Sequence, residues 1–166
     1  RTNNIDFTAT DKVSLFAGVR KLSDAATGIV CELSANLNSN VGCFYLAAPP
    51  SSNFQRFGLV VKGNTAGNVE SNILSAPISA TLSTRIDFSG DTTNLRTNGV
   101  LSANTSSFSK GNLGNYPLYI GRRGGTSLPF NGHIYGLISI GKLTSDNETA
   151  AIEKELAKRL GVTLNV

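Results

Sequence analysis

Tyrosine, arginine and histidine side chains with ligand-binding chemistry gather in the later part of the chain, at Tyr116, Tyr119, Arg122, Arg123 and His133. Phenol hydroxyls and guanidinium forks bind the hydroxyl and carboxylate groups of a glycan or of an acidic protein surface. An imidazole acts as a general base or as a ligand. These five residues are the candidates for a ligand-binding site. The alternative is that the tyrosines pack under loops, the arginines are solvated and the histidine lies on an exposed strand.

Carboxylates that could hydrolyse a glycosidic bond are scattered along the chain. Glycosidases place two of them roughly 5–10 Å apart, and no E-x-D-x-x-E run is present. The acidic residues before the C-terminal part are Asp6, Asp11, Asp24, Glu32, Glu70, Asp87 and Asp91. Pairs from distant strands could still meet in the fold. The pattern therefore leans against an enzyme and leaves a glycoside hydrolase or polysaccharide lyase with a dispersed carboxylate site as the alternative.

Metal and sulfur chemistry have few candidates. Asp87 and Asp91 could hold Ca²⁺, which takes several oxygen ligands, although ordinary turn capping by Asp is favoured; no other cofactor is indicated. Cys31 and Cys43 flank an Asn-rich turn, and a hairpin centred on Leu37 would place them opposite each other. A cross-strand disulfide stays open, but we favour two buried, reduced cysteines.

Composition and charge exclude two classes of partner. The 166 residues include 17 glycines and only 16% charged residues, a mix that favours short strands joined by turns. The net charge is +4, but the basic residues are scattered without an arginine-rich tract, so we expect no nucleic-acid partner. No apolar run approaches the ~20 residues of a membrane span, so no membrane insertion is expected. Because the chain starts at Arg1 without Met, we expect a piece excised from a longer protein.

The segment 132–140 predicts a strand that closes the fold. Ile134, Ile138 and Ile140 recur at alternate positions, so we expect them on the core face. The other face carries Tyr135 and Leu137, which are the nearest apolar surface for the element that follows. We therefore expect a helix to pack against these two side chains.

That helix is predicted over residues 145–160. Ser145 and Glu148 form a capping box at its start, and Gly161 stands where a left-handed C-terminal cap is expected. An apolar stripe follows at a spacing of four residues, made of Ile152, Leu156 and Leu160.

The rest of the chain predicts about ten short strands at hairpin spacing. Asn98-Gly99 between two alternating segments is the strongest hairpin signal. Residues 63–75 are rich in Asn, Gly and Ser and predict a long exposed connection. The loops at 106–116 and 122–129 are expected to be neighbours through the short strand at 118–121. The fold class is all-β: a two-sheet antiparallel β-sandwich with one C-terminal α-helix packed on a sheet, in one domain over residues 1–166.

Three stretches of the sequence resemble the concanavalin A-like lectin/glucanase superfamily, in its laminin-G-like jelly-roll branch. They are residues 13–20, residues 85–99, and the combination of 118–121, 130–134 and the helix up to Gly161. Their order is similar to that in jelly-roll domains of bacteriophage tail proteins and tailspikes.

The resemblance implies a non-enzymatic jelly-roll module of a phage-like virion or other surface structure. Such a module serves adhesion or structural attachment, with glycan binding as one means. Its expected partner is a surface glycan or a neighbouring structural protein, and its expected place is the virion or the extracellular surface. A homo-oligomer within a larger assembly stays open.

Overall fold

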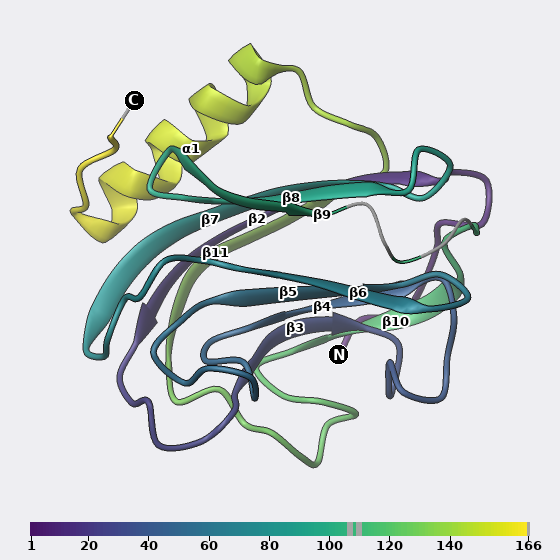
Figure 1. The fold of residues 1–166 in the computed structure, drawn as a ribbon, viewed down its shortest axis with the longest axis horizontal. Helices are drawn as coiled ribbons and strands as arrows, with labels where there is room; N and C mark the ends of the chain where they lie inside the picture. Colours follow the sequence, from purple (N-terminus) through teal and green to yellow (C-terminus); the bar gives the residue numbers. More distant parts are fainter. Residues whose placement is uncertain (106–107, 109–110, 166) are drawn as a thin grey trace.

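Two antiparallel β-sheets lie face to face, and a helix covers the outer face of one of them (Figure 1). The computed structural model describes residues 1–105, 108 and 111–165. The six-stranded sheet has the order β1-β10-β3-β4-β5-β6, and the five-stranded sheet has the order β11-β2-β7-β8-β9. The strands are β1 Asn4–Asp6, β2 Lys12–Lys21, β3 Ile29–Leu33, β4 Cys43–Ala47, β5 Gly58–Lys62, β6 Ala66–Glu70, β7 Ile78–Asp87, β8 Thr92–Thr97, β9 Val100–Thr105, β10 Asn115–Ile120 and β11 Gly132–Ile140. The predicted jelly-roll β-sandwich with a C-terminal helix is confirmed; the assignment of residues 1–166 to one domain stays a prediction.

The core lies between the sheets because the strands alternate in apolar side chains. In β2, Val13, Leu15, Ala17 and Val19 point inward and are fully or almost fully buried. Burying each large side chain of this kind stabilises the fold by about 1.5–3 kcal/mol. The same alternation sends every second residue of β2 outward, so that Arg20 lies on the outer face of the five-stranded sheet.

The hairpin signal at Asn98-Gly99 is confirmed, but the long connection predicted for residues 63–75 is wrong. Asn98 and Gly99 both have positive φ, 51° and 84°, as the tight turn between β8 and β9 requires. Residues 66–70 form β6, which pairs with β5 at the edge of the six-stranded sheet. The sequence of β6, AGNVE, has low strand propensity, and pairing with β5 overrides that propensity.

The β3–β4 hairpin does not place its two cysteines opposite each other. Leu33 pairs with Phe44, and Cys31 pairs with Leu46, so the turn is not centred on Leu37. Both cysteines are free and buried. Burial raises the pKa of the Cys31 thiol to about 12 and that of the Cys43 thiol to about 11. The favoured expectation of two buried, reduced cysteines is therefore confirmed.

A β-bulge in β11 changes which side chains face the core. The register against β2 shifts between Ile134 and Gly136, so that Tyr135 is an extra residue. As a result Ile134 and Leu137 both pack against the core, whereas Ile138 faces outward and is 39% exposed. The expectation that Ile138 shares the core face and that Leu137 receives the helix is wrong for this reason.

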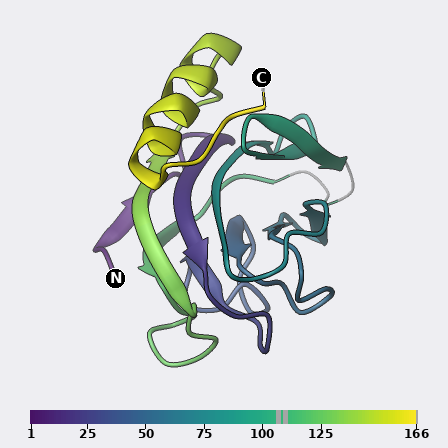
Figure 2. The same ribbon diagram turned by 90° about the vertical axis from the view of Figure 1, so that its left-hand side faces the viewer.

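Helix α1, Asp146–Leu160, lies across the outer face of the five-stranded sheet (Figure 2). Its capping box at Ser145 and Glu148 is formed as predicted, and Gly161 ends it with φ 67°. Glycines on the neighbouring strands β2 and β11 make room for the helix. A Cβ on Gly136 would lie 2.7 Å from Leu156 Cδ2, and one on Gly18 would lie 2.5 Å from Leu160 Cδ1. Within the described residues, no helix is long and apolar enough to cross a membrane.

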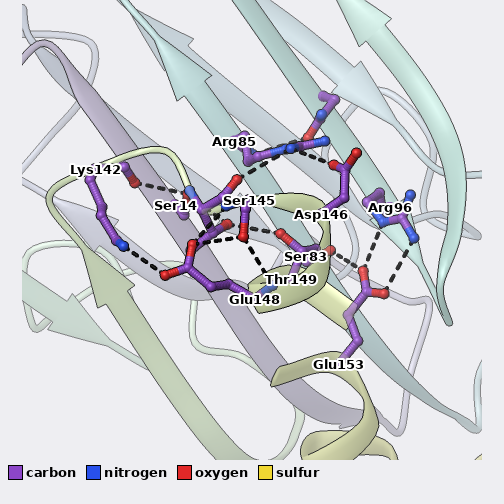
Figure 3. Close-up of polar contacts among 12 residues, drawn as sticks. Ser14, Ser83, Arg85, Arg96, Lys142, Ser145, Asp146, Glu148, Thr149 and Glu153 are labelled. Carbon is purple, nitrogen blue, oxygen red and sulfur yellow. Dashed lines mark hydrogen bonds and ion pairs between the residues drawn. The ribbon is translucent and has the colours of Figure 1, made fainter. Parts of the chain in front are cut away.

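The interface between the helix and the sheet is also polar, which the apolar stripe did not predict (Figure 3). Glu153 is only 1% exposed; it accepts hydrogen bonds from the Ser83 hydroxyl and, over 2.8 Å, from Arg96 Nε. Arg85 Nη1 lies 2.8 Å from Asp146 Oδ1 in the first turn. Of the predicted stripe, Leu156 is buried, whereas its neighbours one turn away are only half-buried. The helix is therefore held by one deep leucine and by ion pairs to the sheet.

Candidate functional site

The arginines of this chain fall into two groups: some form an ion pair with a carboxylate, and the others do not. Eight arginines are present. Those in ion pairs are Arg56, Arg85, Arg96, Arg123 and Arg159. The remaining three, Arg1, Arg20 and Arg122, form no ion pair with any carboxylate of the described residues. Their guanidinium groups are open to an anionic ligand.

Arg122 lines an open pocket of about 380 Å³ after the end of β10. We call it the Arg122 pocket; its other lining residues are Arg1, Tyr119, Ile120, Gly124 and Gly125. Arg1 Nη1 donates a hydrogen bond of 3.3 Å to the Tyr119 hydroxyl, and Arg122 Nη1 lies 3.5 Å from the Gly125 carbonyl oxygen. Among the described residues that line it, none is acidic. The volume lies within the range of small-ligand sites, and the polar groups suit an anionic ligand that also offers hydroxyls.

Arg123, next in sequence, anchors the same loop. Its Nε donates a hydrogen bond of 2.9 Å to Glu32 Oε2, and its guanidinium lies 5.1 Å from the centre of the Tyr45 ring. The other oxygen of Glu32 accepts a 2.6 Å hydrogen bond from the amide of Leu37. Burial raises the pKa of Glu32, although the bonds from Arg123 and Leu37 act in the opposite direction. Arg123 is thus tied to Glu32, which leaves Arg122 as the member of the pair that faces the pocket.

The two tyrosines of β10 lie on opposite faces of their strand. Tyr119 contributes to the Arg122 pocket, whereas Tyr116 packs against the core and its hydroxyl donates to the Val41 carbonyl oxygen over 3.1 Å. The loops at 106–116 and 122–129 leave β10 at its two ends, and part of the first lies outside the described residues. The expected cluster of Tyr116 with Arg122 is therefore not brought together.

His133 lies on the other sheet. It pairs with Arg20 across β11 and β2, and its ring centre is 6.3 Å from that of Tyr135. Arg20 and Tyr135 were not among the sequence candidates for a site. The inward positions of β2 already indicated that Arg20 points outward, but its pairing with His133 required the register of two strands far apart in sequence.

The acidic candidates sit in turns. Asp87 accepts hydrogen bonds from the Gly90 amide at 2.8 Å and the Ser89 hydroxyl at 2.9 Å, and it lies 3.4 Å from Lys12 Nζ. Asp91 accepts from the Phe108 amide at 3.1 Å. Among the residues that the structure describes, no group of three or more His, Cys, Asp or Glu side chains could hold a metal ion. Calcium binding at Asp87 and Asp91 stays a prediction.

Two carboxylates, those of Asp11 and Asp87, contact the same ammonium group. Lys12 Nζ is 3.0 Å from Asp11 Oδ1 and 3.4 Å from Asp87 Oδ1. Hydrogen bonds from Ser89 and Lys12 lower the pKa of Asp11. Burial acts in the opposite direction on Asp87, but hydrogen bonds from Gly90 and Ser89 and the charge of Lys12 lower its pKa as well. A glycosidase needs one carboxyl group that stays protonated as a general acid, and the lowered pKa values of Asp11 and Asp87 act against that role.

Comparison with known proteins identifies similar folds but no related sequence. No protein-family model and no curated protein sequence matches this chain. Among solved structures, the CBM40 of Ruminococcus gnavus IT-sialidase, bound to α2,3-sialyllactose, has a TM-score of 0.68 at 18% identity and covers 87% of this chain and 83% of its own. A SAP-like pentraxin from Limulus polyphemus has a TM-score of 0.67 at 11% identity, covering 87% of this chain and 70% of its own.

The LG4-5 domains of the mouse laminin α1 chain have a TM-score of 0.62 at 14% identity, covering 80% of this chain and 36% of theirs. Similarity at these identities concerns the fold. The structure is a jelly-roll β-sandwich of the concanavalin A-like kind, a fold that it shares with laminin G domains.

Proposed function

We propose that this chain is a non-enzymatic glycan-binding module whose ligand carries a carboxylate, and that it binds this ligand in the Arg122 pocket. The observation that carries the proposal is the guanidinium of Arg122, which is unpaired with any described carboxylate and lines a pocket whose described residues include no acidic one. The structural similarity to a CBM40 bound to α2,3-sialyllactose supports the same class of ligand.

The chemistry of the pocket favours an acidic sugar over a neutral one. A guanidinium fork binds a carboxylate through two parallel, charge-assisted hydrogen bonds, which are about twice as strong as neutral ones. The Tyr119 hydroxyl is in place to hydrogen-bond a sugar hydroxyl, and Ile120, which is largely exposed, offers an apolar contact to a sugar ring. The Glu32–Arg123 pair holds the loop in this shape before the ligand arrives.

The proposed setting is the surface of a phage-like virion or another extracellular structure, where the module serves adhesion. This part rests on the resemblance of the sequence to jelly-roll domains of phage tails. Repetition of the module in an oligomer would raise the avidity for a glycan-coated surface without new contacts.

A titration with α2,3-sialyllactose and with lactose tests the proposal, because the two ligands differ by the acidic sugar. We expect binding of sialyllactose only, and a loss of about tenfold or more in Arg122→Ala, since a hydrogen bond to a charged group is worth about 1.5–3 kcal/mol. Arg159→Ala is the matched control, because Arg159 is paired with Glu155 on the helix. Equal affinity for both sugars, or an unaffected Arg122→Ala variant, would contradict the proposal.

The same samples test the hydrolase or lyase alternative. Incubation with acidic polysaccharides should release no new reducing ends and no unsaturated ends if the module only binds. Their appearance, and their loss in Asp11→Asn or Asp87→Asn, would select an enzyme with a dispersed carboxylate site instead.

A further inference from the structure

A second group of unpaired polar side chains lies on the outer face of the five-stranded sheet. Arg20 and His133 are directly opposite each other in the antiparallel pair β2–β11, so their side chains emerge on the same face. The ring of Tyr135, 44% exposed, lies beside that of His133. The guanidinium of Arg20 has no hydrogen-bond or ion-pair partner within the described part of the chain. We call Arg20, His133 and Tyr135 the β2–β11 patch.

The helix leaves this patch uncovered. Leu160, the last residue of α1, lies over Gly18, and Arg20 is the next outward position along β2. After the left-handed Gly161 the chain turns towards β8 and β9, where the Asn165 amide donates to the Asn98 carbonyl oxygen. Figure 2 shows the helix at one end of β11 and β2 and the loop that leads into β11 at their other end.

Arg20 differs from the other arginines on the outer face of the five-stranded sheet in having no ion-pair partner among the described residues. Arg85 and Arg96 also point outward from this sheet, and both are neutralised by carboxylates of the helix, Asp146 and Glu153. The last turn of the helix carries Lys158 and Arg159, and none of the described residues after it, 161–165, has an acidic side chain. The guanidinium of Arg20 therefore stands unneutralised on a rigid sheet, beside an exposed aromatic ring.

The patch and the Arg122 pocket lie at the same end of the sandwich. β10 ends at Ile120, which lines the pocket, and β11 begins at Gly132, next to His133. The segment 121–131 between them is fixed to both sheets: the Ile29 amide of β3 donates to the Leu128 carbonyl oxygen, and the Leu22 amide, directly after β2, donates to that of Asn131. The start of this segment contributes Arg122, Gly124 and Gly125 to the pocket, and its C-terminal end continues into β11 and the patch.

We propose that the β2–β11 patch is a second subsite, which binds another acidic unit of an extended, polyanionic glycan. This deepens the proposed function, since it makes the preferred ligand a chain with repeated carboxylates. Arg20 would hold a sugar carboxylate through its guanidinium fork. Tyr135 would pack against the apolar side of the sugar ring, and the imidazole of His133 would hydrogen-bond a hydroxyl.

Two binding sites on the same domain should produce a measurable difference in affinity between long and short ligands. A ligand that reaches both binds the second site at a high effective concentration, so its affinity exceeds that of a ligand reaching only one. The probes are an α2,8-linked hexamer of N-acetylneuraminic acid, with six carboxylates, and α2,3-sialyllactose, with one. We expect the wild-type protein to bind the hexamer at least tenfold more tightly than sialyllactose.

The variants Arg20→Ala and Tyr135→Ala test the subsite. Both side chains are exposed and neither forms a hydrogen bond or ion pair with the described residues, so we expect unchanged melting temperatures and a loss of about tenfold in affinity for the hexamer. Lys154→Ala, at an exposed position on the helix, is the control and should bind like the wild type. Amide NMR signals of residues 132–136 should shift on addition of the hexamer to the wild-type protein.

The outcomes separate this inference from the proposed function. Normal hexamer binding by Arg20→Ala and Tyr135→Ala, with loss in Arg122→Ala, would overturn the second subsite and leave the Arg122 pocket standing. Loss in Arg20→Ala, with normal binding in Arg122→Ala, would support the patch and contradict the pocket. A wild-type protein that binds neither probe would overturn both.

Discussion

Leu156 is the apolar anchor of the C-terminal helix, and replacing it with alanine tests how the helix is held. The side chain is 3% exposed and lies against Gly136 and Gly18 of the sheet. Leu156→Ala removes three carbon atoms from this site, which at about 0.8 kcal/mol each amounts to about 2.4 kcal/mol of lost burial. Leucine-to-alanine changes in cores cost ~2–5 kcal/mol in total, because a cavity adds to this loss.

The cavity contribution should be small at this site. A groove of about 340 Å³ runs between the helix and β11 and is lined by Leu156 itself, so the space that the leucine leaves opens to water. We therefore expect a loss of about 2.5–3 kcal/mol in the free energy of unfolding. For a chain of this length that corresponds to a fall of about 5–12 °C in melting temperature.

Urea titration and calorimetry would measure this loss, with Lys154→Ala as the control. Lys154 is exposed on the same helix, and its removal should change the stability by less than ~0.5 kcal/mol. Equal melting temperatures for the two variants would refute the conclusion that Leu156 anchors the helix.

A double-mutant cycle localises the contact to Gly136. A methyl group on Gly136 would lie 2.7 Å from Leu156 Cδ2, so Gly136→Ala alone should cost about 1–3 kcal/mol through overpacking. In the Leu156→Ala background that obstacle is absent, and the same change should cost little. A coupling of ~1 kcal/mol or more is expected; additive costs would show that the two residues do not meet.

Two further predictions concern thiol chemistry and pH. Cys31 and Cys43 are buried with raised pKa values, so neither should react with a thiol reagent until the protein unfolds, and a reductant should leave the unfolding midpoint unchanged; labelling of the native protein would contradict this. Hydrogen bonds from Lys142 and Ser145 lower the pKa of Glu148 to about 2, below the ~4.3 of an unfolded glutamate, so this carboxylate stabilises the fold fully above the unfolded value and loses that effect as the pH falls towards 2. We expect Glu148→Gln to be less stable than the wild type at neutral pH and equally stable near pH 2 in pH-dependent denaturation, and a constant difference at all pH values would rule this out.

Local patterns in the sequence were sufficient for the fold class and for most elements. The Asn98-Gly99 turn, the Ser145–Glu148 capping box and the left-handed cap at Gly161 each depend on residues close together in the chain. Turn and cap residues act through backbone groups within a few positions. These features therefore appear in the structure as predicted.

The pairing of strands far apart in the sequence decided which side chains of β11 face the core and which residues lie beside them. The bulge at Tyr135 depends on how β11 fits β2, and it reversed the faces of Leu137 and Ile138. The same pairing placed Arg20 beside His133.

The candidate site was likewise only partly visible in the sequence. Arg122 and Arg123 are adjacent and chemically identical, and only the buried Glu32, far away in the chain, separates the anchor from the residue that faces the pocket. A charge is neutralised by whichever partner the fold brings to it, and the low dielectric of a buried site strengthens the attraction between opposite charges. The sequence alone therefore determined which residues have the chemistry to bind a glycan, whereas the tertiary structure decided which of their charges stay unpaired.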